Sequence, residues 1–183
     1  MRLLIIETLI GPVEFASFLG TTKRVLESEV TYTLVPIESE LPKGMAVKLV
    51  RAVLVKLRPQ ATRYNVRVGF KWLKPLQDSG DPQSGEWLEA QSWEQNGFIV
   101  MVGTEDYEAL ARRLPDRGLS EEEFPVTYHS NGIDVLFPRI PGGELTSLHF
   151  VVAENTIPEP AECSSWFAVD VSHSKILAVV VES

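Results

Sequence analysis

Two Asn-Gly dipeptides constrain the fold of this chain more than any other feature. Asn96-Gly97 and Asn131-Gly132 each separate two short runs that are rich in apolar residues. Asn-Gly is the preferred pair for a two-residue turn in which both residues have positive φ, and such turns join antiparallel strands. The sequence therefore predicts two β-hairpins, one formed by 86–93 and 98–102 and the other by 124–128 and 133–137.

Apolar and aromatic side chains alternate with polar or small ones along residues 63–73, which predicts a strand with one buried face. The buried face would hold Tyr64, Val66, Val68, Phe70 and Trp72. The solvent-exposed, basic face would hold Arg63, Asn65, Arg67, Gly69 and Lys71. Further strands are predicted at 2–6, 30–36 and 145–153. Residues 13–29 fit either a helix or a hairpin that turns at Gly20.

The longest predicted helix covers residues 45–58, where apolar side chains recur at three- and four-residue steps. A second helix is predicted over 105–114, with Thr104 as its N-cap. Near the C-terminus, 166–171 and 175–181 are expected to form a final pair of strands. Because 175–181 is apolar on both faces, it is expected to be a central strand of the sheet.

These elements define an α+β fold with a largely antiparallel sheet and two or three helices. The 183 residues are expected to form a single α+β domain, 1–183. The polar segment 77–85 is longer than the usual connection between elements. It is either a mobile loop or a joint between two sub-domains.

The composition and the missing motifs exclude several classes of protein. One cysteine, Cys163, excludes an internal disulfide framework, and no apolar run approaches the ~20 residues that span a bilayer. The N-terminus lacks the pattern of a secretory leader, so the cytoplasm is the expected location. The chain contains no phosphate-binding loop, dinucleotide-binding glycine pattern or nucleophile elbow. We therefore expect no cofactor and no catalytic residues.

Cysteine and histidine are the remaining residue types that could carry chemistry. Cys163 could act as a nucleophile with His149 or His173 as base and Asp170 as the orienting carboxylate. Its acidic neighbour disfavours the thiolate, so an unreactive thiol is expected. The three histidines, the third being His129, are separated by 20 and 24 residues, and no metal site is predicted from them.

The net charge of −8 is distributed unevenly along the chain. Residues 1–75 hold 12 of the 17 Lys and Arg with only six Asp and Glu, whereas 76–183 hold five basic and 19 acidic residues. The segment 43–75 alone has nine basic residues and no acid. Either the two halves neutralise each other across a mixed surface, or one patch faces a partner of opposite charge.

An acidic domain without a catalytic signature favours a non-catalytic binding protein. The specific expectation is an inhibitor or immunity-type protein that neutralises a basic protein partner, such as a toxin enzyme, through an acidic surface. Loop acids would steer this partner and tryptophans would anchor it, although each tryptophan could instead fill the core. The expected partner-binding residues are Glu121, Glu122, Glu123, Glu159, Glu162, Trp87, Trp93 and Trp166.

The alternative is an enzyme or small-ligand binder that holds an anion with basic residues of segment 43–75, namely Arg63, Arg67 and Lys71. A nucleic-acid partner is disfavoured, because the aromatic side chains of 63–73 would face away from these cations and the pI is about 5.0. No membrane partner is expected. The sequence leaves the oligomeric state and the identity of the partner open.

Overall fold

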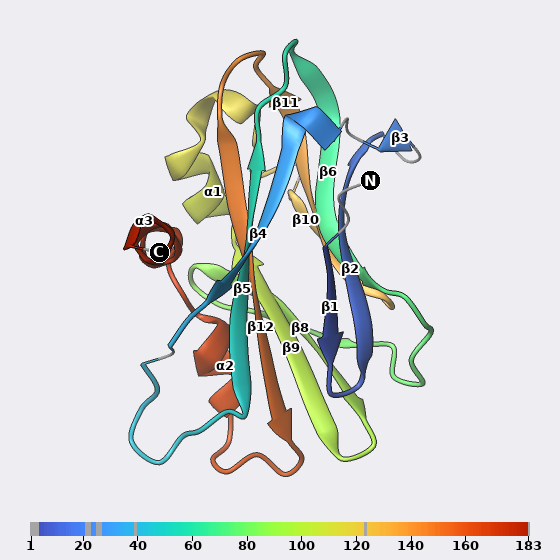
Figure 1. The fold of residues 1–183 in the computed structure, drawn as a ribbon, viewed down its shortest axis with the longest axis vertical. Helices are drawn as coiled ribbons and strands as arrows, with labels where there is room; N and C mark the ends of the chain where they lie inside the picture. Colours follow the sequence, from blue (N-terminus) through green and yellow to red (C-terminus); the bar gives the residue numbers. More distant parts are fainter. Residues whose placement is uncertain (1–3, 21–22, 25–26, 39, 123, 183) are drawn as a thin grey trace.

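The computed structural model describes residues 4–182 except 21–22, 25–26, 39 and 123. Its strands form two antiparallel sheets that lie face to face, and two helices near the C-terminus lie against the outer side of one sheet (Figure 1). Half of the protein, 50%, is strand and 16% is helix. The predicted α+β class with largely antiparallel strands is therefore confirmed.

Sheet one has the strand order β1-β2-β6-β11-β10, and the short β3 pairs with β2. Its strands are β1 (Leu4–Thr8), β2 (Gly11–Leu19), β3 (Lys23–Arg24), β6 (Arg63–Trp72), β10 (Val126–His129) and β11 (Gly132–Ile140). The central strand β6 is the strand predicted at 63–73. Its inward side chains from Val66 to Trp72 are buried as expected, but Tyr64 is 63% exposed.

Sheet two has the order β4-β5-β12-β9-β8-β7. Its strands are β4 (Val30–Pro36), β5 (Leu49–Leu57), β7 (Asp81–Ser84), β8 (Leu88–Gln95), β9 (Phe98–Glu105) and β12 (Thr146–Thr156). The strands predicted at 30–36 and 145–153 are thus β4 and most of β12. Part of the predicted loop 77–85 is an edge strand, because Asp81–Ser84 pairs with β8.

Both predicted hairpins form. Asn96 and Gly97 have φ of 53° and 79° and connect β8 to β9 through the expected two-residue turn. In the second hairpin His129 pairs with Gly132, so the two turn residues are Ser130 and Asn131, one position earlier than expected. The N-terminal ambiguity is resolved as a hairpin, because β2 pairs antiparallel with β3; residues 21–22 lie outside the described part. The strand expected at 2–6 is β1, which begins in the described residues at Leu4.

The helix predicted over 45–58 is wrong, because this segment contains strand β5. Its apolar residues face both sides of sheet two: Val53 and Val55 lie in the core between the sheets, and Ala52 and Leu54 lie in a second core under the helices. A strand buried on both faces is a continuous apolar run, which periodicity cannot separate from a buried helix. The many β-branched residues of the segment favour the strand.

The final strand pair is also wrong, because both of its segments are helical. Helix α2 is Ser164–Val169 and helix α3 is His173–Glu182, and both lie against the outer side of sheet two (Figure 1). Ile176 is fully buried, but Val181 is 86% exposed. The run at 175–181 therefore buries only one side, as a surface helix does, and is not a central strand.

The helix predicted over 105–114 is confirmed as α1 (Tyr107–Arg113), which the 3-10 turn η2 (Pro115–Arg117) follows; a second 3-10 turn, η1, spans Glu27–Glu29. The N-cap is Asp106 rather than Thr104, because the Asp106 carboxylate accepts a 2.8 Å hydrogen bond from the Ala109 amide. Thr104 remains in β9 and donates a hydrogen bond to the His149 carbonyl oxygen. Leu110 of α1 belongs to the core between the sheets, so α1 closes one end of that core.

Candidate functional site

In the part of the chain that the structure describes, two cavities bring together titratable side chains from several elements. The first, called here the outer-face hollow, lies on the open side of sheet one and is lined by Glu14, Arg67, Lys71, His129 and Asp134 among others. The second, called here the histidine pocket, lies at the end of β9 beside the helices, and its inner wall holds Glu105, His149 and His173.

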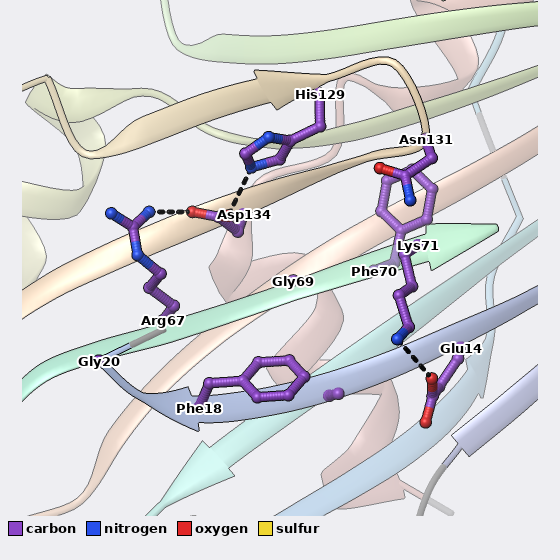
Figure 2. Close-up of a pocket in the computed structure, with 11 residues that line it drawn as sticks. Glu14, Phe18, Gly20, Arg67, Gly69, Phe70, Lys71, His129, Asn131 and Asp134 are labelled. Atoms are coloured by element: carbon purple, nitrogen blue, oxygen red, sulfur yellow. Dashed lines mark hydrogen bonds and ion pairs between the residues drawn. The ribbon is translucent and has the colours of Figure 1, made fainter. Parts of the chain in front are cut away.

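The outer-face hollow lies over β6, where Gly69 stands between the long basic side chains of Arg67 and Lys71 (Figure 2). Arg67, Gly69 and Lys71 lie on one face of β6, and Gly69 is directly opposite Asp134 on β11. A Cβ atom at Gly69 would lie 2.7 Å from the Asp134 Cβ and 2.3 Å from the Ile133 carbonyl oxygen. Only glycine therefore fits here, and Gly69 forms part of the lining of the hollow, whose volume is about 260 Å³.

Each cation of the outer-face hollow has a carboxylate partner. Arg67 Nη1 lies 2.7 Å from Asp134 Oδ1, and His129 Nε2 lies 2.6 Å from the other oxygen of the same carboxylate (Figure 2). Lys71 Nζ lies 3.4 Å from the buried Glu14 carboxylate. The charges of the lysine and arginine are thus balanced within the hollow, which offers an anion no surplus positive charge.

The third residue of the anion-binding alternative, Arg63, is engaged elsewhere. Arg63 donates two hydrogen bonds to the buried Glu29 carboxylate, of 3.1 and 2.7 Å. These bonds hold the pKa of Glu29 below its usual value. Arg51, from the same basic segment, pairs with Glu154 of the acidic half of the chain. Four of the nine basic residues of segment 43–75 therefore pair with the protein's own carboxylates in the described residues: Arg51, Arg63, Arg67 and Lys71.

The three tryptophans expected to anchor a partner have different environments. Trp93 is fully buried between the sheets and donates a 3.1 Å hydrogen bond to the Ser130 carbonyl oxygen. Trp166 is half-buried against the core under the helices. Trp87 is 40% exposed, and the Arg112 guanidinium lies 4.5 Å from its ring centre.

The five loop acids expected to steer a partner also differ. Glu121, Glu122 and Glu162 are exposed, and in the part of the chain that the structure describes they form no ion pair. Glu159 instead accepts hydrogen bonds from the Ser165 amide and the Asn155 side chain, at 2.8 and 3.1 Å, and so fixes the start of α2. Glu123 lies outside the described residues.

In the histidine pocket, three elements that are distant in sequence place their side chains at one point. Glu105 ends β9, His149 lies in β12, and His173 begins α3. The Nδ1 atoms of the two histidines are 3.0 Å apart, and Glu105 Oε2 lies 3.7 Å from each of them. All three side chains are at least nine-tenths buried.

The surroundings of this cluster fix its orientation. His149 Nε2 lies 2.8 Å from the Val171 carbonyl oxygen, which can only accept a hydrogen bond, so Nε2 carries the proton and Nδ1 a lone pair. His173 Nε2 lies 3.0 Å from the Ser147 hydroxyl. Arg113 donates to both oxygens of the Glu105 carboxylate.

Burial also determines the charge of the two histidines. It lowers the pKa of His149 below its usual value, and it lowers the pKa of His173 to about 3, with the nearby Arg113 guanidinium acting in the same direction. Both rings are therefore neutral at physiological pH. Two neutral imidazoles and a carboxylate that face one another are a set of donor atoms suited to a divalent metal ion.

Sequence reasoning missed the histidine cluster, because its members are separated by 44 and 24 residues and no ligand spacing links them. The Cys163 arrangement weighed from the sequence does not form in the described residues: Cys163 is exposed and has no hydrogen bond to either histidine. Asp170 does line the histidine pocket, together with Trp87 and Arg112 at its rim.

The chain matches no protein-family model and no curated protein sequence. Among the helices of the described residues, none has the length and apolar character needed to cross a membrane.

Proposed function

We propose that the protein is a non-catalytic binding protein of the inhibitor or immunity type, which neutralises a basic protein partner through an acidic surface. The observation that carries this proposal is the internal pairing of positive charge. Seven Lys or Arg side chains pair with Asp or Glu in the described residues. Each pair removes one positive and one negative charge, so the net charge of the chain stays at −8. The charge left to attract a partner is predominantly negative.

The proposed anchor is Trp87, because it is the most accessible of the three tryptophans considered. Exposed acids flank it: Glu86 precedes it in the chain, and Asp170 lines the same pocket. The protein's own Arg112 lies 4.5 Å from the ring centre, so a lysine or arginine of a partner would contact the exposed part of the indole together with the acids. Trp93 supports the fold rather than the interface, since it has no exposed surface.

The proposed steering residues are the exposed loop acids Glu121, Glu122 and Glu162, together with Glu123, which follows Glu122 in the chain. Each exposed charge contributes little alone, about 0.2–1 kcal/mol. Their joint effect is on the association rate, which long-range attraction raises most at low ionic strength. Glu159 contributes less, because its carboxylate is already engaged at the start of α2.

The test begins by using the untagged full chain, immobilised through surface lysines, to capture partners from the native cell. The recovered protein must be basic, and its activity must fall to zero at one equivalent of the purified chain. A Trp87→Ala chain should keep its fold and bind at least 10-fold more weakly, as expected for a hot-spot residue worth about 2 kcal/mol.

Matched charge reversals then test the steering. The triple variant Glu121→Lys, Glu122→Lys, Glu162→Lys is compared with the control triple Glu7→Lys, Glu38→Lys, Asp81→Lys, whose residues are also exposed. Both triples change the net charge from −8 by the same amount. The first should slow association more than the control at low salt, and the difference should shrink at 0.15 M salt, where the Debye length is about 8 Å. If both triple variants slow association equally, the effect comes from the net charge alone, and these three acids are not part of the interface.

The alternative, an anion-binding enzyme or small-ligand binder, finds less support in the geometry. Arg67 and Lys71 line one hollow but hold carboxylates there, and Arg63 is not among the residues that line it. Tight binding of a small anion that Arg67→Gln abolishes, with no protein partner recovered, would favour the alternative.

A further inference from the structure

The histidine pocket has the dimensions of a metal site. The three facing atoms, Nδ1 of His149, Nδ1 of His173 and Oε2 of Glu105, form a triangle with sides of 3.0, 3.7 and 3.7 Å. A point equidistant from all three lies about 2.0 Å from each, which matches zinc–nitrogen and zinc–oxygen bonds of about 2.0–2.2 Å. A metal ion would fit between the side chains as they stand.

The hydrogen bonds around the triangle are those that a metal site uses. A histidine that binds metal through one nitrogen donates its other N–H to a carbonyl or another acceptor. His149 makes this bond to the Val171 carbonyl oxygen, and His173 can make it to the Ser147 hydroxyl. With both Nε2 atoms protonated, two lone pairs face each other at 3.0 Å, an arrangement that needs a cation between them.

We propose that Glu105, His149 and His173 bind one zinc ion, or a transition metal of similar preference, with a further coordination position open to the histidine pocket. Two imidazole nitrogens and one carboxylate oxygen are ligands that zinc accepts and that calcium and magnesium do not favour as a set. The metal site shares its pocket with the proposed anchor Trp87, but metal binding does not require a partner, and neither inference requires the other.

The open position follows from the shape of the pocket. The cluster lies on the wall of a cavity of about 430 Å³, which has room for water molecules as further ligands. Three protein ligands plus an open position is the arrangement of zinc sites that exchange ligands, rather than of closed structural sites. Arg113 keeps the Glu105 carboxylate in place, and each carboxylate oxygen can accept this bond and still bind a metal.

A purely structural explanation competes with this proposal. His173 could place its proton on Nδ1 and donate it to His149 Nδ1, with its Nε2 accepting from the Ser147 hydroxyl. That arrangement satisfies all four ring nitrogens without a metal. The two explanations differ in the tautomer of His173 and in metal content, and both can be measured.

The experiment uses the untagged full chain, stripped with a chelator and dialysed against buffer with zinc chloride. Metal analysis should find one zinc per chain in the wild type and less than about a tenth of that in His173→Gln, because one of three protein ligands is lost. His129→Gln is the matched control, since His129 is an exposed histidine of sheet one with no part in the cluster. It should retain one zinc. Cobalt chloride in place of zinc should give visible absorption that His173→Gln abolishes.

Two further measurements keep the proposal falsifiable if His173→Gln does not fold. Glu105→Gln keeps the shape of the side chain and should also lose zinc. In the wild type, nitrogen-15 spectra of the imidazole rings should show both histidines as Nε2–H tautomers once one equivalent of zinc is added. A folded wild-type chain that retains no zinc, a Nδ1–H tautomer of His173 that zinc does not change, or full zinc content in Glu105→Gln would each overturn the proposal.

Discussion

Replacing Trp93 by alanine should remove a large part of the protein's stability, while the same change at Trp87 should not. Trp93 has no exposed surface, and its ring contacts Phe70 and Trp72 edge to face, with centroids 5.4 and 5.6 Å apart. A buried tryptophan removes about 150–250 Å² from water, equivalent to about 4–6 kcal/mol at about 25 cal/mol per Å². Measured Trp→Ala costs in cores are about 3–5 kcal/mol. We therefore expect Trp93→Ala to lose about 4 kcal/mol.

Trp87 has a much smaller role in the fold. It is 40% exposed, and the contact with Arg112 is worth about 0.5–1 kcal/mol. Urea unfolding followed by circular dichroism gives both free energies of unfolding directly. In a chain of this size 1 kcal/mol corresponds to about 2–4 °C in Tm, so Trp93→Ala should lower Tm by about 8–16 °C. If Trp93→Ala does not fold, Trp93→Phe should show a smaller loss of the same sign. The reasoning fails if Trp93→Ala costs less than about 1 kcal/mol or if Trp87→Ala costs more than about 2 kcal/mol.

Three further changes have defined outcomes. Burial raises the pKa of Glu89. The folded protein therefore loses stability as the pH rises from about 4.5 through that raised pKa. Glu89→Gln should raise Tm at pH 7, and this increase in Tm should vanish near pH 4. The Arg63 hydrogen bonds lower the pKa of Glu29. The ionised carboxylate therefore stabilises the fold above about pH 4.5, and this stabilisation is lost as the pH falls through the lowered pKa. Glu29→Gln should lower the free energy of unfolding by about 2 kcal/mol at pH 7, and urea unfolding should show a smaller loss at pH 3. Cys163→Ser should leave the free energy of unfolding within about 0.5 kcal/mol, because the exposed thiol makes no hydrogen bond in the described residues. A loss of more than about 1 kcal/mol in urea unfolding would contradict this.

The parts of the fold that the sequence predicts correctly are those set by neighbouring residues. The hairpin at Asn96-Gly97 needs only a turn that accepts positive φ between two strands. Strand β6 alternates because one of its faces packs in the core and the other meets solvent. Each pattern involves only neighbouring residues, so the structure that it predicts does not depend on how distant parts of the chain fold.

The wrong predictions concern segments whose neighbours come from far away in the chain. The residues from Leu49 to Leu57 are a strand because sheet two has an apolar core on both sides, and this could not be known before α2 and α3 were placed. The residues from His173 to Glu182 are a helix although valine and isoleucine favour strands. Packing against sheet two, where Ile176 is fully buried, outweighs that modest local preference.

The missed histidine cluster and the wrong C-terminal strands have the same origin. If 166–171 and 175–181 formed a strand pair, His173 would lie in the turn between them, where a solvated histidine is ordinary. Helix α3 instead begins at His173 and leaves its ring 3.0 Å from His149, whose own position is fixed by β12 and by the Val171 carbonyl oxygen. No spacing rule applies to ligands brought together in this way, because the chain reverses between them. A different sequence signal would have helped: a histidine at the start of an apolar helix. When such a helix packs on a sheet, the imidazole is buried, and its ring nitrogens then need a hydrogen-bond partner or a metal ion, which a second histidine nearby can provide or help to bind.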